Sequence, residues 1–158
     1  MTRPSISRRA IIALALLASA AFFACSESSN DGSIAVHIGA LTVRAEVART
    51  AEQRSQGLSG RHSLAEDAGM LFTNGEVRTP SIWMKNMRFP LDLIFISSDL
   101  RVTEVIDNVP APEPGTPDAD LPSYRPADPG LYFLEVNAGI AAQFGVSPGD
   151  AVDFEPEP

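Results

Sequence analysis

Apolar and polar residues alternate along several short segments of the chain, as they do in β-strands that have one face in a protein core. The segment 41–47 shows this most clearly, because Val43, Ala45 and Val47 alternate with an arginine and a glutamate. The same patterns predict strands at residues 34–38, 41–47, 69–72, 81–86, 91–97, 102–106, 131–136 and 151–154. A threonine-asparagine-glycine run at residues 73–75 is expected to end the third strand.

Two short helices are predicted between these strands. Thr50 and Gln53 match a capping box, in which the threonine hydroxyl accepts a hydrogen bond from the Gln53 amide and the glutamine side chain reaches back. The helix that follows is expected to end near Gly57. Asn137 is expected to cap a second helix at residues 138–144.

Many short strands with two short helices favour a mainly β (α+β) fold. We expect a small antiparallel β-barrel-like domain at residues 34–158, because closing a sheet removes its exposed edges. An open sheet with helices on one face is the alternative architecture.

One long segment, residues 109–130, does not fit the strand pattern. It contains seven prolines in 22 residues, and proline cannot donate to a strand ladder, so we expect a loop. Loops of this length in compact domains are usually functional or disordered. Tyr124 interrupts its polar, proline-rich composition, and we interpret the proline-rich loop as a semi-rigid flap with Tyr124 as its anchor.

The N-terminal 24 residues are typical of a secretory signal peptide. Arginines precede an uncharged apolar run at residues 10–23, which is shorter than the roughly 20 residues that a membrane-spanning helix needs. The only cysteine of the chain, Cys25, follows directly, and residues 22–25 resemble a bacterial lipobox. We therefore expect export to the cell envelope, a lipid on Cys25 that anchors the protein to a membrane, and a flexible tether at residues 25–33. A plain signal peptide and an uncleaved anchor are the alternatives.

The charge of the chain argues against one class of partner. Without the three arginines of the signal segment, nine basic residues stand against 20 acidic ones, a net charge of −11. Such a surface repels phosphate backbones, so nucleic acid is not an expected partner. The two histidines are far apart and no histidine–cysteine cluster exists, so we expect no metal ion and no other cofactor.

The most informative single residue is Lys85. The other 11 basic residues are all arginine, and the one lysine lies two positions after Trp83, the only tryptophan. If residues 81–86 form a strand, Trp83, Lys85 and Met87 share one face, and the ammonium can make a cation–π contact with the indole.

Several other polar residues are candidates for the same site. Asp92 lies in an otherwise apolar segment, so its carboxylate must be paired or solvated. It could pair with Lys85, with Arg54 or with Arg61, and a purely structural salt bridge is as good an interpretation as a functional one. Glu135 could line the same pocket as Lys85.

Short motifs along the chain occur in the order found in one family. They are Arg54-Ser55-Gln56-Gly57-Leu58, Gly69-Met70-Leu71-Phe72, Trp83-Met84-Lys85-Asn86, Pro90-Leu91-Asp92, Asn108-Val109-Pro110, Leu134-Glu135-Val136-Asn137-Ala138-Gly139 and Pro148-Gly149-Asp150. Together they resemble domain-of-unknown-function family 192 of bacteria and archaea. The resemblance implies a mainly β domain, often exported, and no particular activity. Many members have a cysteine pair in the segment that matches residues 111–122, which this chain lacks.

These observations lead to a hypothesis of ligand binding without catalytic residues. We expect a groove between a hairpin of residues 83–92 and the proline-rich loop, and we expect this groove to take a small polar ligand or a polymer of the cell envelope. The expected ligand-binding residues are Arg61, Trp83, Lys85, Asn86, Asp92, Tyr124 and Glu135. Two other classes stay open: an envelope hydrolase or transferase that uses Lys85 and Asp92, and a protein-interaction module.

Overall fold

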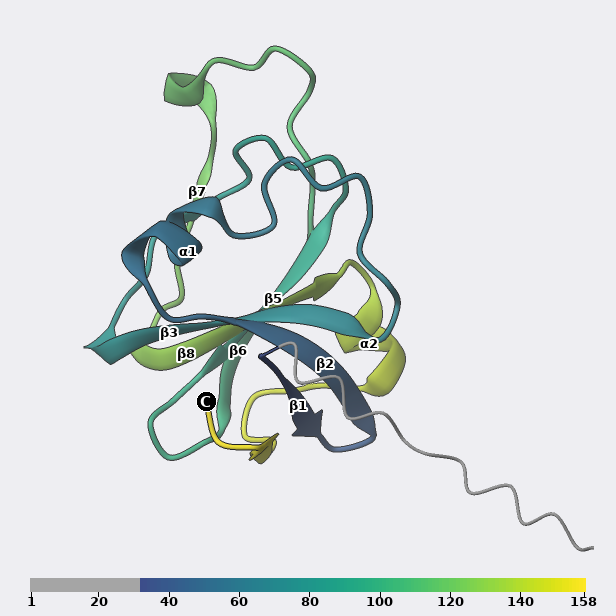
Figure 1. Cartoon of the computed structure of the whole chain (residues 1–158), viewed down its shortest axis with the longest axis vertical. Coiled ribbons are helices and arrows are strands. Elements are labelled where there is room, and N and C mark those ends of the chain that lie inside the picture. The colour runs from purple at the N-terminus through teal and green to yellow at the C-terminus, as the bar shows by residue number, and fades with distance from the viewer. Residues whose placement is uncertain (1–31) are drawn as a thin grey trace, which may run out of the picture.

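The computed structural model describes residues 32–158, so the predicted signal peptide, Cys25 and most of the tether lie outside the described residues. A seven-stranded sheet dominates, with the strand order β6-β5-β8-β3-β2-β1-β9 (Figure 1). Its strands are β1 (Ser33–Ile38), β2 (Leu41–Ala48), β3 (Ala68–Arg78), β5 (Leu91–Ile96), β6 (Val102–Val109), β8 (Gly130–Asn137) and β9 (Val152–Glu155). Only β2 and β3 pair in parallel; the other neighbours in this sheet are antiparallel.

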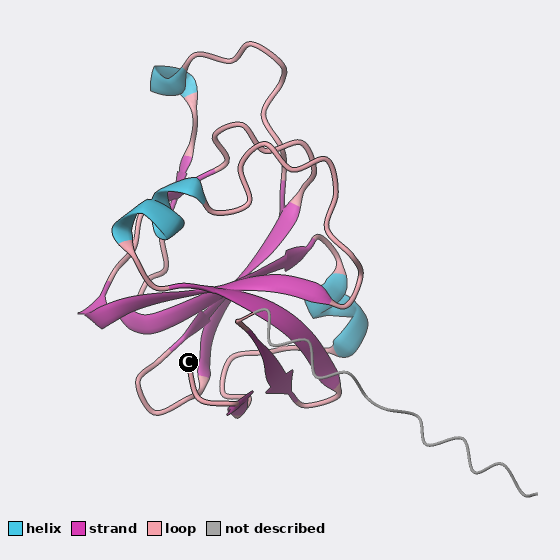
Figure 2. Cartoon of the chain, in the orientation of Figure 1, coloured by secondary structure: helices cyan, strands magenta, loops and turns pink. Residues whose placement is uncertain are grey.

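The two end strands of this sheet approach each other. An antiparallel bridge joins Arg101, just before β6, to Ala151, just before β9. Backbone hydrogen bonds reinforce it, since Val102 N–H donates to Asp150 O and Val152 N–H donates to Leu100 O, each over 2.9 Å. The sheet is therefore curled into a half-barrel, as the strands in Figure 2 show, and the expected mainly β, barrel-like fold is confirmed.

Two apolar clusters lie on opposite faces of the sheet. The first, the interior cluster, joins residues of all seven strands with α2 (Ile140–Phe144). The second, the outer cluster, joins β3, β5 and β8 to Leu58 and to the segment 82–87. Strand β5 is buried along its whole length because both of its faces are covered.

The first helix, α1 (Ala51–Gln56), has the predicted capping box. Gln53 N–H donates to the Thr50 hydroxyl over 3.2 Å, and Thr50 N–H donates to the Gln53 side chain over 3.0 Å. In Figure 1, α1 and the proline-rich loop lie at the same end of the molecule, away from the C-terminus.

The prediction for the start of the second helix was wrong. The N-cap of α2 is Gly139, with a left-handed backbone, and the Asn137 side chain instead donates to the carbonyls of Leu64 and Ala65 over 3.1 Å. Asn137 is the last residue of β8, so its side chain is used to hold the loop before β3 rather than to begin a helix.

The extents of two predicted strands also differ from the structure. The third strand does not end at residues 73–75, because β3 continues to Arg78 with a register shift against β8. The predicted strand 81–86 is only β4 (Ile82–Trp83), which pairs with β7 (Ser123–Tyr124) in a separate two-stranded sheet. The proline-rich loop thus contributes the strand β7, and it also contains a 3₁₀ turn, η1 (Asp118–Asp120).

Asp92 is fully buried and has a structural role that the sequence did not predict. Its carboxylate accepts a hydrogen bond from Asn108 N–H over 2.8 Å and from Ala141 N–H over 2.9 Å. The ladder between β5 and β6 shifts register beside Asp92, and this shift turns the Asn108 amide toward it. Asp92 thus satisfies a free amide in the first turn of α2, which has no side-chain cap of its own.

Replacing Asp92 with alanine should leave the buried amide of Ala141 and the part-buried amide of Asn108 without partners. At roughly 1–3 kcal/mol for each unsatisfied group, we expect Asp92→Ala to lower the free energy of unfolding by about 2–5 kcal/mol in urea denaturation. The exposed Asp128→Ala is the control and should change it by less than about 0.5 kcal/mol. Equal stability of the two variants would contradict this role of Asp92.

Candidate functional site

A groove of about 820 Å³ runs along the surface between α1, the turn after β4 and the proline-rich loop. We call it the Trp83 groove. Its lining residues come from three segments, 55–60, 83–88 and 111–121. The lining mixes hydroxyl, amide and charged side chains with the indole of Trp83 and several prolines, so it offers both polar partners and flat apolar surface.

Trp83 and Lys85 lie together at this groove. Trp83 is 50% exposed, and the Lys85 ammonium lies 5.2 Å from the centroid of the indole ring. The ammonium also donates to the carboxylate of Asp118, which η1 contributes from the proline-rich loop. The proposed pair between Lys85 and Asp92 is therefore wrong, since Asp92 lies inside the sheet with backbone partners, and Asp92 does not pair with Arg54 or Arg61 either.

A turn, and not a strand, presents Lys85 and Asn86 to the groove. Met87 N–H donates to Met84 O over 3.1 Å, and Asn86 has a left-handed backbone with φ of 57°. The Ser59 hydroxyl donates to Lys85 O over 2.7 Å, and a second backbone hydrogen bond ties Asn86 O to the loop after α1. Met87 borders the Trp83 groove with Trp83 and Lys85, but the turn buries most of its side chain in the outer cluster.

A smaller hollow of about 100 Å³ adjoins the Trp83 groove, and it contains Glu135. We call it the Glu135 hollow. The two cavities share the lining residues Ser55, Gln56, Ser59, Trp83 and Met87, so they lie next to each other. Apolar side chains of the outer cluster, among them the stacked rings of Phe72 and Phe133, line the rest of the hollow.

Strand alternation explains why a glutamate is buried here. Leu134 and Val136 of β8 face the interior cluster, so Glu135 between them must point to the outer cluster. Its cross-strand neighbours there are Met70 of β3 and Leu93 of β5. Glu135 is 6% exposed, and burial raises the pKa of its carboxyl from 4.5 to about 8.

Glu135 forms no hydrogen bond and no ion pair with the residues that the structure describes. The one other charged side chain of the same lining is Arg54, whose guanidinium donates to the carbonyls of Arg49 and Thr73 over 2.6 Å and 3.3 Å. The hollow therefore holds a desolvated carboxyl whose hydrogen-bonding capacity is unused.

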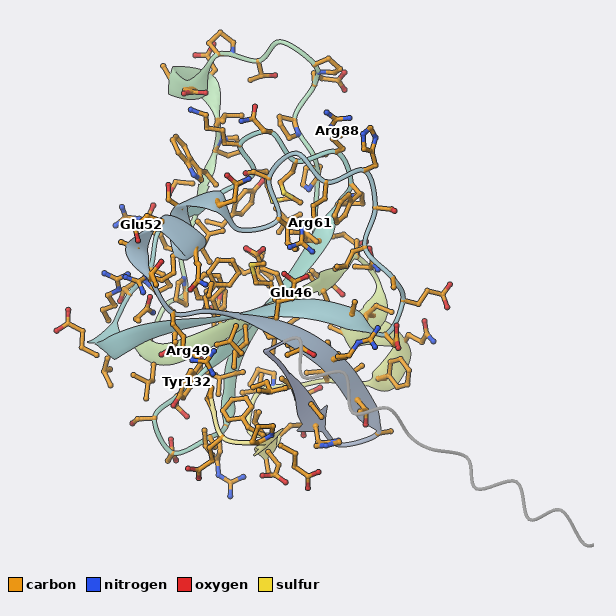
Figure 3. The ribbon with its side chains drawn as sticks, in the orientation of Figure 1. Glu46, Arg49, Glu52, Arg61, Arg88 and Tyr132 are labelled. Atoms are coloured by element: carbon orange, nitrogen blue, oxygen red, sulfur yellow. The ribbon has the colours of Figure 1, made fainter. Side chains whose placement is uncertain are left out.

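Two predicted site residues lie elsewhere. Arg61 makes a two-pronged ion pair with Glu46, at 2.6 Å and 2.7 Å, and Figure 3 shows the two side chains pointing toward each other. The hydrogen bond with Glu46 raises the pKa of Arg61. Arg61 borders a separate cavity of about 370 Å³ over β2, outside the lining of the Trp83 groove.

Tyr124 is also outside the lining of the Trp83 groove. It pairs with Ile82 in the small sheet, and its half-buried ring packs against the outer cluster. It fixes one end of the proline-rich loop to the domain and does not close over the groove.

Sequence reasoning missed the residues that only folding brings to the groove. Asp118 belongs to an acidic part of the proline-rich loop, and nothing in that composition points to Lys85 as its partner. Ser55, Gln56 and Ser59 lie within or next to a motif that was recognised, but no chemistry distinguished them. Among residues 32–158, no group of three or more histidine, cysteine or acidic side chains could hold a metal ion.

Comparison with known sequences identifies the class of protein. Residues 34–154 match the family described as Uncharacterized ACR, domain-of-unknown-function family 192. The match covers most of the chain, so the protein belongs to this family, as the motifs had indicated. No curated protein matches the chain.

Two crystal structures are similar over most of the chain. One is a proposed transcription regulator from Sinorhizobium meliloti 1021, with 37% sequence identity and a TM-score of 0.68, covering 77% of this chain and 92% of that one. The other is a protein of unknown function from Novosphingobium aromaticivorans DSM 12444, with 34% identity and a TM-score of 0.65, covering 77% of this chain and 83% of that one.

The buried carboxyl of Glu135 should make stability depend on pH. Its folded-state pKa lies above the unfolded value, so the folded protein holds the proton more tightly, and stability is lost as the pH rises from about 4.5 to about 8. Compared with Glu135→Gln, the wild-type free energy of unfolding should fall by about 1.4 kcal/mol per pH unit in this range. Urea denaturation of both proteins from pH 4 to pH 9 measures this. A constant difference between the two would contradict it.

Proposed function

We propose that the Trp83 groove binds a small polar ligand that has a flat, weakly polar face, such as a sugar ring. The half-exposed indole of Trp83 carries this proposal. A tryptophan buries most of its ring when it has only a structural role, and a ring left open beside polar groups is typical of ligand recognition.

The charges around the groove favour a ligand without strong net charge. Lys85 and Arg88 supply two positive groups, and Glu113 and Asp118 supply two negative groups from the proline-rich loop. The ion pair between Lys85 and Asp118 already neutralises one of each. Asn86, Gln56 and the nearby hydroxyl groups then provide the neutral donors and acceptors that hold a polyhydroxylated ligand.

The proline-rich loop supports the same proposal in a different way. Its prolines restrict the backbone before any ligand arrives, so little conformational entropy remains to be lost when the groove is filled. The ion pair of Lys85 and the packing of Tyr124 hold the loop at two points. The groove is thereby largely formed in advance.

The enzyme and interaction alternatives receive less support. Catalysis through Lys85 and Asp92 needs the two groups to meet, and they have separate partners. A protein-interaction module would present an apolar patch. The large exposed apolar residues among residues 32–158 are Val77, Trp83 and Phe144, from three different elements, β3, β4 and α2.

Ligand binding can be followed through the emission of Trp83, since it is the only tryptophan. In a screen of monosaccharides, disaccharides and polyols, we expect at least one to shift the emission with saturation. Variants of Trp83 lack this emission, so their binding is followed by saturation-transfer NMR. Trp83→Phe should keep binding, whereas Trp83→Ala should weaken it tenfold or more, about 1.4 kcal/mol.

Two further variants control the experiment. Lys85→Ala should also weaken binding, because it removes both the donor and the tie to Asp118. Val77→Ala removes a similarly exposed apolar side chain outside the groove and should leave affinity unchanged. If no member of the panel binds, or if Lys85→Ala binds as the wild type does at equal stability, the proposal is wrong.

We also propose that the protein is exported and held at a membrane of the cell envelope by lipid on Cys25. The sequence of the first 25 residues supports this proposal. In a bacterial host fed radiolabelled palmitate, the wild-type chain should carry label and sediment with membranes. Cys25→Ala should lose both properties, and a labelled Cys25→Ala protein would refute the anchor.

A further inference from the structure

The Glu135 hollow contains a buried carboxyl group that has no hydrogen bond or ion pair with the residues that the structure describes. A carboxyl that is 6% exposed normally has hydrogen-bond partners, because burying a polar group without them costs free energy. Asp92, one strand away and equally surrounded by apolar residues, has two such partners, while Glu135 has none among the described residues. Within residues 32–158, no interaction of Glu135 therefore offsets the cost of burying its carboxyl.

The side chains packed around Glu135 are almost all uncharged. Its neighbours on β3 and β5 are apolar, as are Met84 and Met87 above it. Arg54 on α1 is the one other charged residue of the lining, and its Nη1 is directed at two backbone carbonyls. A carboxylate in this position has no compensating charge at hydrogen-bonding distance within residues 32–158.

Aromatic side chains form part of the wall of the hollow. The rings of Phe72 and Phe133 stack with centroids 4.3 Å apart, and Trp83 borders both the hollow and the groove. The faces of aromatic rings attract cations, more strongly where water is excluded. The volume of about 100 Å³ has room for a few non-hydrogen atoms.

We propose that the Glu135 hollow is a subsite for a primary ammonium group of the ligand, with the Glu135 carboxylate as its counter-ion. The ligand class is then a polar molecule that carries an amine on a short stem, for example an amino sugar whose ring lies on Trp83. This inference deepens the proposed function and rests on it for the identity of the whole ligand, but the hollow can be tested alone.

Binding of an ammonium group must release a proton. In the free protein at pH 7 the carboxyl is mostly protonated, because burial raises its pKa to about 8. An incoming R–NH₃⁺ stabilises the carboxylate, so the proton of the carboxyl passes to solvent and the hollow then holds one positive and one negative charge. Amines of this type keep their own proton up to about pH 10.

The test uses methylammonium chloride as the probe and the folded wild-type protein. In ¹³C NMR titration of the Glu135 carboxyl, saturating methylammonium should lower its apparent pKa by at least one unit. Methanol, a neutral probe of similar size, and sodium chloride at equal ionic strength should leave it unchanged. For a pKa decrease of one unit, the affinity for methylammonium should rise about fivefold from pH 6 to pH 8, more for a larger decrease, and level off above about pH 9.

Variants of Glu135 separate a binding role from a structural one. Glu135→Gln keeps the shape of the protonated side chain and should fold normally, but it should bind methylammonium at least tenfold more weakly at pH 8 and without the pH dependence. Glu135→Asp withdraws the carboxyl by one methylene and should bind more weakly while keeping the pH dependence. Equal binding by wild type and Glu135→Gln, pH-independent affinity, or no binding at any pH would overturn the proposal.

The outcome at the hollow is distinguishable from the outcome at the groove. Loss of the methylammonium response, with saccharide binding still sensitive to Trp83→Ala, would remove the ammonium subsite and leave the proposed function. A methylammonium response that depends on Glu135, with no saccharide bound, would keep the subsite and remove the sugar-like part of the ligand.

Discussion

The neighbouring inner strands β5 and β8 bury residues on both of their faces, and the position of the candidate site follows from this constraint. A strand covered on one side can send polar residues to water, but a strand covered on both sides cannot. Asp92 and Glu135 are the two acidic residues that these strands bury. Asp92 faces the interior side, where Ala141 of α2 and Asn108 of β6 supply backbone amides. Glu135 faces the outer cluster, which supplies no hydrogen-bond donor to it within the described residues.

Loops, together with the short two-stranded sheet of β4 and β7, cover the face of the large sheet that carries the outer cluster. The segment 82–87, Leu58 after α1 and the ends of the proline-rich loop pack onto β3, β5 and β8. Loops fill a surface less regularly than helices or strands do, and the Trp83 groove and the Glu135 hollow lie where they meet. The candidate site is thus a consequence of how the sheet is covered.

Sequence reasoning succeeded where the physical cause is local. The alternation of residues 41–47, the capping box at Thr50 and the proline content of the long loop each act within a few residues, and the structure has the expected strand, cap and loop. Sequence reasoning failed where contacts with a distant segment of the chain determine the local backbone conformation. Residues 84–86 look like strand, but a turn is fixed there by hydrogen bonds from Ser59 and Gly60, which lie about 25 residues earlier in the chain.

The sequence by itself determined the mainly β fold, the family and the neighbourhood of Trp83 and Lys85, because strand periodicity and ordered motifs are written in consecutive residues. Only the tertiary structure decided the partners: Asp118 for Lys85, backbone amides for Asp92, Glu46 for Arg61, and none among the described residues for Glu135. Partners of buried and paired charges are chosen by long-range packing, since a side chain can satisfy its charge only with groups that the fold brings within a few ångströms.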